Sequence, residues 1–261
     1  MKDKYGQHVS VSLHAGHIAE VIIDRPPNNH VSVTLMSDLA DALEDLDKEA
    51  DCRATVLRTE GKAFCAGADL VSTDGDHGIE NETSNPLYDQ AVRLYAVQKP
   101  IVVAVQGAAV GAGLGLALIG DFRVAAHEAR FSANFTRLGF HPGFGLTHTL
   151  PRLIGHGRAE LMFLTSRRVK ADEALAWGLA DQVVNLGELR DAAFSLAREI
   201  AENAPLAIVS TRKTLRGDLA TAVREATNRE FVEQAWLRKT EDFQEGIRSV
   251  NERRLGNFKG R

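Results

Sequence analysis

The chain has 261 residues, which allows one large domain or two small ones, and either can bury a core unaided. Lys and Arg number 31 against 35 Asp and Glu, so the net charge is −4 and nothing favours a nucleic-acid or anionic-membrane partner. No apolar run approaches the roughly 18 residues of a membrane-spanning helix. The first ten residues lack a secretory pattern, and two cysteines cannot build a disulfide framework, so we expect a cytoplasmic protein.

The first half of the chain alternates between predicted strands and helices. Alternating apolar residues over 8–24, with a turn at Ala15 and Gly16, predict an antiparallel hairpin. Helical spacing over 33–50 predicts a helix, and short apolar runs at 53–59 and 101–105 predict two buried strands. Residues 71–82 are rich in Asp, Gly and Thr and predict a surface loop. This succession favours an α/β core with right-handed crossovers.

The last third is predicted to be helical. Apolar residues recur at helical spacing over 159–164, 171–177, 189–203, 206–215 and 219–239. Only residues 181–184 favour a strand within this part. His14 and His17 lie in the N-terminal hairpin, where residues three apart face opposite sides, so we expect no metal site there.

Small residues crowd a strand-to-helix turn at 106–117, which reads QGAAVGAGLGLA. One interpretation is a dinucleotide-binding fingerprint, but Leu116 stands where its third glycine is needed. A second is that the small residues only let the helix pack closely on the sheet. A third is that the turn presents a free backbone N–H at a helix N-terminus, where negative charge is favoured.

A second turn of small residues occurs at 61–70, GKAFCAGADL, directly after the strand predicted at 53–59. Two such turns at neighbouring strands can meet at the sheet edge where α/β proteins bind ligands. Two converging N–H donors would then suit an oxyanion. Cys65, within this turn, is expected to be a small buried residue rather than a nucleophile.

Five motifs in order carry a resemblance to a known family: GKAFCAGADL, KPIVVAVQGAAVGAGLGLAL, GDFRVAAHEARFS, LGFHPGFG and WGLADQVV. They closely resemble the enoyl-CoA hydratase/isomerase (crotonase) superfamily, from the RPPNN turn to the final NFKG. The resemblance implies an α/β fold, a crotonase-like spiral of ββα units with a C-terminal α-helical layer. It implies an acyl-CoA-binding core over 1–200 and a helical trimerisation region over 201–261. The expected assembly is a homotrimer or a dimer of trimers, held mostly by helices within 206–252.

The resemblance also implies a site. The oxygen of an acyl-CoA thioester would lie between the backbone N–H groups of Ala68 and Ala112, which stabilise an enolate. Coenzyme A enters as part of the substrate, and neither a separate cofactor nor a metal is implied. The implied substrate-binding residues are Arg25, Pro27, Asn28, Ala66, Asp69 and Leu70.

The chain departs from the family pattern at the acids. The two glutamates of the family's hydratases correspond to Gly115 and Phe135, and a third acid position corresponds to Gly143. Replacing both glutamates would make the acyl pocket drier and roomier. Two alternatives remain open: an enzyme with an unusual acid–base group, or a non-catalytic acyl-CoA-binding protein. The substitutes considered are His141, whose simpler interpretation is a packed loop residue, and the polar side chains Asp74, Asp76, His77 and Glu80.

Overall fold

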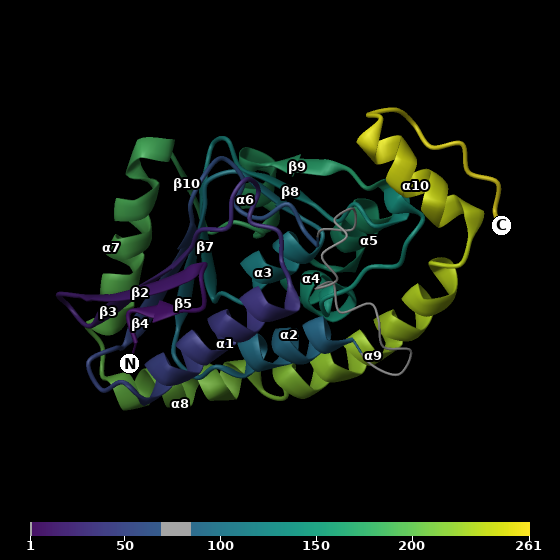
Figure 1. Cartoon of the computed structure of the whole chain (residues 1–261). Coiled ribbons are helices and arrows are strands. Elements are labelled where there is room, and N and C mark those ends of the chain that lie inside the picture. The colour runs from purple at the N-terminus through teal and green to yellow at the C-terminus, as the bar shows by residue number, and fades with distance from the viewer. Residues whose placement is uncertain (1, 69–84) are drawn as a thin grey trace.

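A computed structural model describes residues 2–68 and 85–261. Its main sheet has seven strands in the order β1-β2-β3-β4-β5-β7-β10 (Figure 1). The first three strands are antiparallel, and β3, β4, β5, β7 and β10 run parallel. The bounds are β1 Lys4–Tyr5, β2 Val9–His14, β3 Ile18–Ile23, β4 Ala54–Thr59, β5 Ile101–Val105, β7 Phe122–Ala126 and β10 Gln182–Val184.

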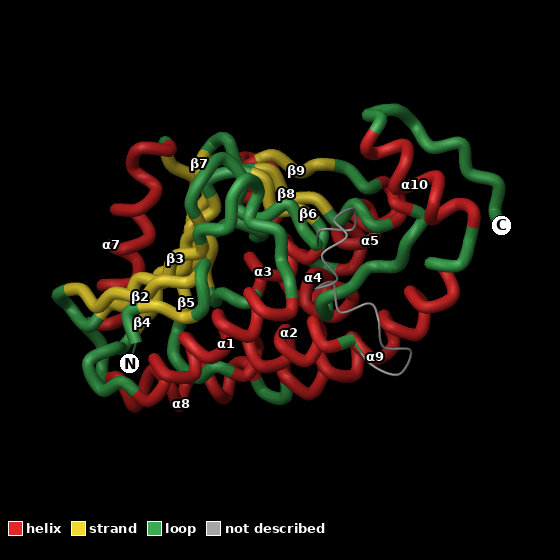
Figure 2. The backbone as a smooth tube through the Cα atoms, in the orientation of Figure 1, coloured by secondary structure: helices red, strands yellow, loops and turns green. Residues whose placement is uncertain are grey.

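A second sheet of three short strands has the order β6-β8-β9 (Figure 2). Its strands are β6 Ala108–Val110, β8 Arg130–Ser132 and β9 Arg168–Lys170, with β6 parallel to β8 and β9 antiparallel to it. Because β6 follows β5 and β8 follows β7, this sheet continues the chain beyond the carboxyl ends of two central strands. It therefore lies where the two turns of small residues are found.

Helices cover both faces of the main sheet. Their bounds are α1 Val33–Lys48, α2 Pro86–Ala96, α3 Ala112–Leu118, α4 Leu146–Ile154, α5 His156–Thr165, α6 Ala171–Trp177, α7 Leu189–Ala201, α8 Pro205–Arg216, α9 Leu219–Leu237 and α10 Glu241–Asn251. One core joins α1, α2 and α3 to one face of the sheet, and a smaller core packs α7 against the other face (Figure 1).

Helix α1 illustrates how the sequence produces these layers. The Ser32 side chain accepts a hydrogen bond from the N–H of Leu35, which caps the helix and contributes about 1 kcal/mol. Leu35, Leu39, Leu43 and Leu46 recur at helical spacing and are buried against the sheet.

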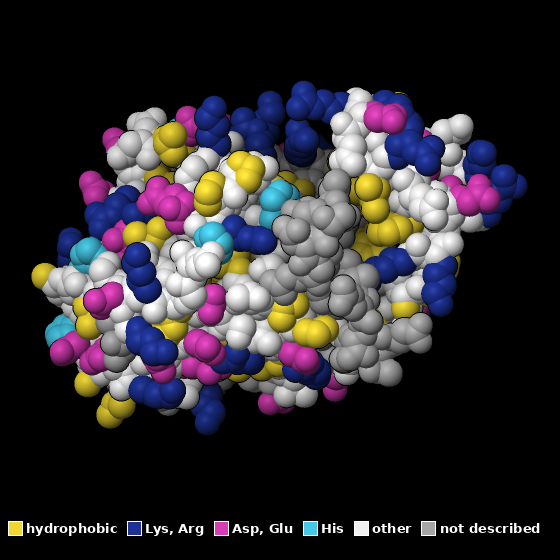
Figure 3. Space-filling view, in the orientation of Figure 1, with side chains coloured by type: hydrophobic (Ala, Val, Ile, Leu, Met, Phe, Trp, Pro, Cys, Tyr) yellow, Lys and Arg dark blue, Asp and Glu magenta, His cyan; other side chains and the backbone are white. Residues whose placement is uncertain are grey.

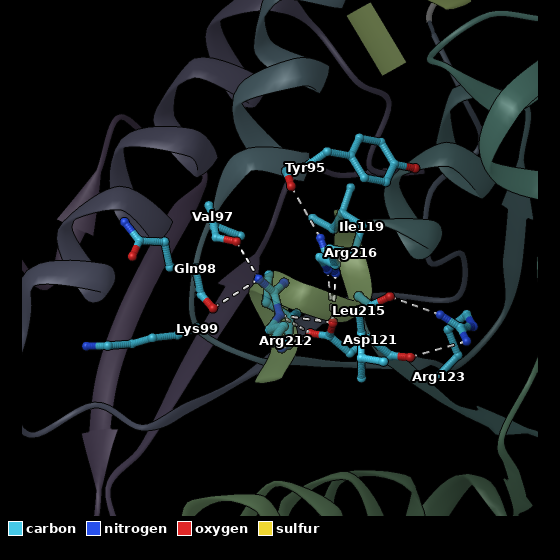
Figure 4. A network of polar contacts seen from close by, with 12 residues as sticks. Tyr95, Val97, Gln98, Lys99, Ile119, Asp121, Arg123, Arg212, Leu215 and Arg216 are labelled. Carbon is cyan, nitrogen blue, oxygen red and sulfur yellow. Dashed lines mark hydrogen bonds and ion pairs between the residues drawn. The ribbon is translucent and has the colours of Figure 1, made fainter. Parts of the chain in front are cut away.

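Buried ion pairs attach the C-terminal helices to the core. Asp121, just before β7, accepts hydrogen bonds from Arg212 and Arg216 of α8 (Figure 4). Arg123 of β7 pairs with Asp181, just before β10. In α9, the Glu230 carboxylate accepts hydrogen bonds from the backbone N–H groups of Gly145 and Thr147. Burial raises the pKa of Glu230, and these donors oppose that rise. Helix α9 is thereby tied to the start of α4.

The main expectations for the fold are confirmed. The hairpin, α1 and the strands at 53–59 and 101–105 are present, as are the predicted C-terminal helices and the strand β10. The short strand β9 lies inside the part predicted to be helical, because three residues are too few to display an alternating pattern. The loop expected at 71–82 lies outside the described residues. None of the described helices has the length and apolar character needed to cross a membrane.

Candidate active site

The two turns of small residues lie against each other. Cys65 and Ala109 form a parallel bridge, in which Cys65 N–H donates to Ala108 O at 2.9 Å and Val110 N–H donates to Cys65 O at 3.0 Å. On the other side, Val31 N–H donates to Gly67 O at 3.0 Å. The segment that ends at Ala68 is therefore held between the chain near Val31 and the strand β6.

Glycines permit this close approach. Gly67 has φ +95°, and a Cβ there would lie 2.9 Å from Val110 O and 3.8 Å from Ala112 N. A Cβ on Gly113 would lie only 2.1 Å from Cys65 O. Side chains at either position would force the turns apart. The glycines thus bring the backbone around Ala68 next to the first residue of α3.

Ala68 and Ala112 line one cavity of about 80 Å³. Within the described part of the chain, neither backbone N–H donates a hydrogen bond. Ala66, Phe135, Leu138, Phe140, Gly143 and Phe144 also line this cavity, with Tyr88 from α2 and Gln234 and Arg238 from the α9 segment. Two free donors therefore face a mostly apolar cavity.

Aromatic side chains occupy the space where the family's hydratases have their two glutamates. Phe135 lines the cavity, whereas Gly115 is buried in α3 and does not line it. A Cβ on Gly115 would lie 2.5 Å from Cδ1 of Phe144. The expectation that Gly115 would share this space and leave the pocket roomier is therefore wrong, because the Phe144 ring fills the space.

Tyr88 and Gln234 occupy the space beside Gly143. A Cβ on Gly143 would lie 2.1 Å from the Tyr88 hydroxyl oxygen and 2.7 Å from Gln234 Nε2. The Tyr88 hydroxyl donates to Gln234 Oε1 at 2.6 Å, and Gln234 Nε2 donates to the backbone oxygens of His141 and Pro142. Burial, followed by the nearby Glu230, raises the pKa of Tyr88. The hydroxyl is therefore a neutral donor at physiological pH.

His141 does not line this cavity. Its Nδ1 lies 2.8 Å from Pro142 O, and its side chain lines a neighbouring cavity of about 600 Å³ together with Phe140, Phe163 and Trp236. Figure 3 shows apolar side chains gathered on the surface between α5 and α10, beside this second cavity. The imidazole is thus not brought to the free N–H groups of Ala68 and Ala112.

Among the expected substrate-binding residues that the structure describes, only Ala66 lines the cavity. Asn28 supports it, because Asn28 O accepts a hydrogen bond from Ala66 N–H at 3.0 Å. Arg25 donates to His30 O and so closes the turn that contains Pro27. Asp69, Leu70, Asp74, Asp76, His77 and Glu80 lie outside the described residues.

Cys65 is fully buried, and burial raises the pKa of its thiol to about 12. It is therefore an unreactive packing residue at neutral pH, as expected. Within residues 2–68 and 85–261, no three His, Cys, Asp or Glu side chains are grouped as metal ligands. The cavity's described lining contains no carboxylate and no imidazole.

Comparisons with known proteins agree with this architecture. Residues 14–261 match the enoyl-CoA hydratase/isomerase family. A short-chain-enoyl-CoA hydratase of Clostridium acetobutylicum is 31% identical over 94% of this chain and 96% of its own. A carnitinyl-CoA dehydratase of Salmonella enteritidis is 30% identical over 97% of this chain and its own full length. The crystal structure of an enoyl-CoA hydratase/isomerase from Pseudoalteromonas atlantica superposes with a TM-score of 0.86, 30% identity and coverage of 97% and 100%.

Proposed function

Because the chain belongs to the enoyl-CoA hydratase/isomerase family, we propose that it binds an acyl-CoA thioester and stabilises the enolate of that thioester. The thioester oxygen would accept hydrogen bonds from the N–H groups of Ala68 and Ala112. The observation that carries this proposal is that both N–H groups are free of described partners and line one cavity. Both donors belong to the backbone, so the loss of catalytic side chains leaves them in place.

In this reaction the negative charge develops on the thioester oxygen, which is the atom that the two N–H groups would contact. When a bond to the α-carbon breaks, its electron pair moves onto the thioester oxygen and forms an enolate. A fixed N–H donor at that oxygen contributes about 3–4 kcal/mol of transition-state stabilisation, judged from the loss of such a donor in other enzymes. Apolar walls at Phe135, Phe140 and Phe144 strengthen this interaction because they exclude water.

Ordinary hydration of a conjugated double bond is not the reaction that this cavity favours. Hydration needs groups that take and give a proton, and the described lining offers no carboxylate or imidazole. The Tyr88 hydroxyl is the described O–H group in the cavity, and we assign it proton donation to the enolate. For this step the hydroxyl must turn away from Gln234 Oε1, and the phenolate that remains regains a proton from solvent when the product leaves. The alternative is a non-catalytic acyl-CoA-binding protein, which the absence of a carboxylate or imidazole from the described lining favours.

Binding and catalysis are tested separately. Isothermal titration should give saturable binding of butyryl-CoA and weaker binding of free coenzyme A. If no thioester binds below millimolar concentration while NAD does, the dinucleotide interpretation of residues 106–117 replaces this one. A panel of enoyl, dienoyl and aromatic enoyl thioesters, followed by the absorbance of the conjugated bond, then separates the alternatives. Turnover above the solution rate supports an enzyme, and binding without turnover supports a binding protein.

We further propose that the remaining features of the family apply to this chain. Arg25, Pro27 and Asn28, with Asp69 and Leu70, would contact the coenzyme A portion in a cytoplasmic enzyme. Helices within 206–252 would form a homotrimer or a dimer of trimers, because Leu206, Leu215 and Trp236 expose apolar surface there. Analytical ultracentrifugation should give one of these two masses, and a monomer at micromolar concentration would contradict the assembly.

A further inference from the structure

Arg238, directly after α9, places a cation that has no ion-pair partner among the described residues in the wall of the candidate site. It lines the same cavity as Ala68 and Ala112. Its Nε is buried and has no hydrogen-bond partner within residues 2–68 and 85–261. Among the described residues, no carboxylate forms an ion pair with its guanidinium. Buried donors in folded proteins are normally paired, so this N–H is a group that needs a partner.

Several buried or half-buried arginines in this protein are paired with carboxylates, and others donate to backbone oxygens. Arg212 and Arg216 share Asp121, as Figure 4 shows, and Arg93 pairs with both Asp41 and Glu44. Each of these contacts joins two elements of the fold. Arg238 makes no such contact with the described chain, so its charge does not serve to hold elements together.

The guanidinium is held in a defined position by an aromatic ring. It lies 5.0 Å from the centre of the Phe140 ring, which packs against one face of the cation. That contact does not use the Nε–H, which has no partner among the described residues. Burial lowers the pKa of Arg238 and the nearby Tyr88 raises it, but an arginine stays protonated in proteins. A positive charge therefore persists in this mostly apolar cavity.

The neighbouring polar side chains are already engaged. Gln234, four residues earlier on the same helical face, accepts from Tyr88 and donates to the backbone oxygens of His141 and Pro142. Tyr88 uses its single O–H in that contact. Neither oxygen of this pair accepts a hydrogen bond from Arg238 in the described part of the chain, and a neutral oxygen is a weaker acceptor for a guanidinium than a carboxylate is. An anion would both neutralise the charge of the guanidinium and accept a hydrogen bond from its Nε–H.

We propose that Arg238 binds a carboxylate carried by the acyl group, so that the preferred ligands are coenzyme A thioesters of dicarboxylic acids. This inference rests on the proposed thioester site, in which Ala68 and Ala112 hold the other end of the acyl group. A carboxylate and a guanidinium form charge-assisted hydrogen bonds, which an apolar environment strengthens. The phosphates of coenzyme A have similar anionic chemistry, so the experiment must separate the two sources.

Isothermal titration with matched pairs of thioesters tests the inference. Succinyl-CoA is compared with butyryl-CoA, glutaryl-CoA with valeryl-CoA, and adipyl-CoA with hexanoyl-CoA, at one salt concentration. For the chain length that reaches Arg238, we expect the carboxylated thioester to bind at least about tenfold more tightly. Arg238→Met should remove this preference and leave the dissociation constant of the neutral thioester within about threefold.

Lys239→Met is the matched control, since it removes one positive charge from the exposed neighbouring position, outside the cavity. It should keep the preference for the carboxylated thioester. Equal binding of both members of every pair would overturn the inference. So would an Arg238→Met variant that weakens all thioesters and free coenzyme A equally, since that result assigns Arg238 to the phosphates. Failure of every thioester to bind would instead overturn the proposed function.

Discussion

The hydroxyl of Tyr88 donates to Oε1 of Gln234 at 2.6 Å, and this pair fills the space that a side chain on residue 143 would occupy. Tyr88 comes from α2 and Gln234 from α9, two helices that pack against each other. The contact therefore closes one wall of the cavity and places a neutral O–H group in it.

Tyr88→Phe removes that O–H group while keeping the ring. If Tyr88 donates the proton, kcat on the preferred thioester should fall by at least about 10²-fold, with KM changed by less than about threefold. Steady-state kinetics measures this split. Tyr95→Phe is the matched control, because the Tyr95 hydroxyl is also buried but donates to Gly115 O outside the cavity lining. An unchanged kcat in Tyr88→Phe would remove the proposed role.

Gly115 and Phe144 should be energetically coupled. Gly115→Glu brings a Cβ to within 2.5 Å of the Phe144 ring, so we expect a loss of about 3 kcal/mol in the free energy of unfolding. Phe144→Gly opens that space and suits the positive φ of residue 144, although it leaves a cavity.

Urea denaturation of the two single variants and the double variant tests this coupling. The double variant should be at least about 1 kcal/mol more stable than the sum of the single effects predicts. Additive effects would show that the ring does not limit residue 115. It also follows that restoring the hydratase glutamates at 115 and 135 requires a smaller residue at 144.

Glu20 should contribute stability that depends on pH. Burial raises its pKa, but hydrogen bonds from Arg190 and Arg58 outweigh burial, and the pKa lies at about 2 instead of 4.5. A carboxyl with a lowered folded-state pKa stabilises the protein above its unfolded pKa. That contribution, about 3 kcal/mol, is lost as the pH falls from 4.5 toward 2.

Urea denaturation of Glu20→Gln and the parent at pH 7 and pH 3 measures this contribution. The variant should be less stable at pH 7, and the difference should shrink markedly at pH 3. Glu128→Gln, at an exposed position, is the control and should follow the parent at both pH values. If the free energies of unfolding of Glu20→Gln and the parent differ by the same amount at both pH values, Glu20 is not the source of the pH dependence.

The sequence was sufficient to predict the architecture, since long periodic segments such as 33–50 and 219–239 determine their own secondary structure. It also predicted that the turns around Ala68 and Ala112 meet. It was not sufficient to show what fills the cavity, because Phe144 and Gly115 are 29 positions apart and their contact depends on packing. Glu230, Gln234 and Arg238 recur every four residues on one helical face, which is visible in the sequence. That spacing does not reveal that the face lines the cavity.

The central claim is that the N–H groups of Ala68 and Ala112 polarise a thioester carbonyl, and the ¹³C resonance of that carbonyl measures it directly. The resonance of [1-¹³C]butyryl-CoA should move downfield on binding to the parent protein. Ala112→Pro removes one N–H at the first position of α3, where proline suits the helix, and should shift the bound resonance back toward its free value. Ala112→Ser keeps the N–H and should preserve the downfield shift. A bound carbonyl whose resonance equals that of the free thioester in the parent protein would contradict the account.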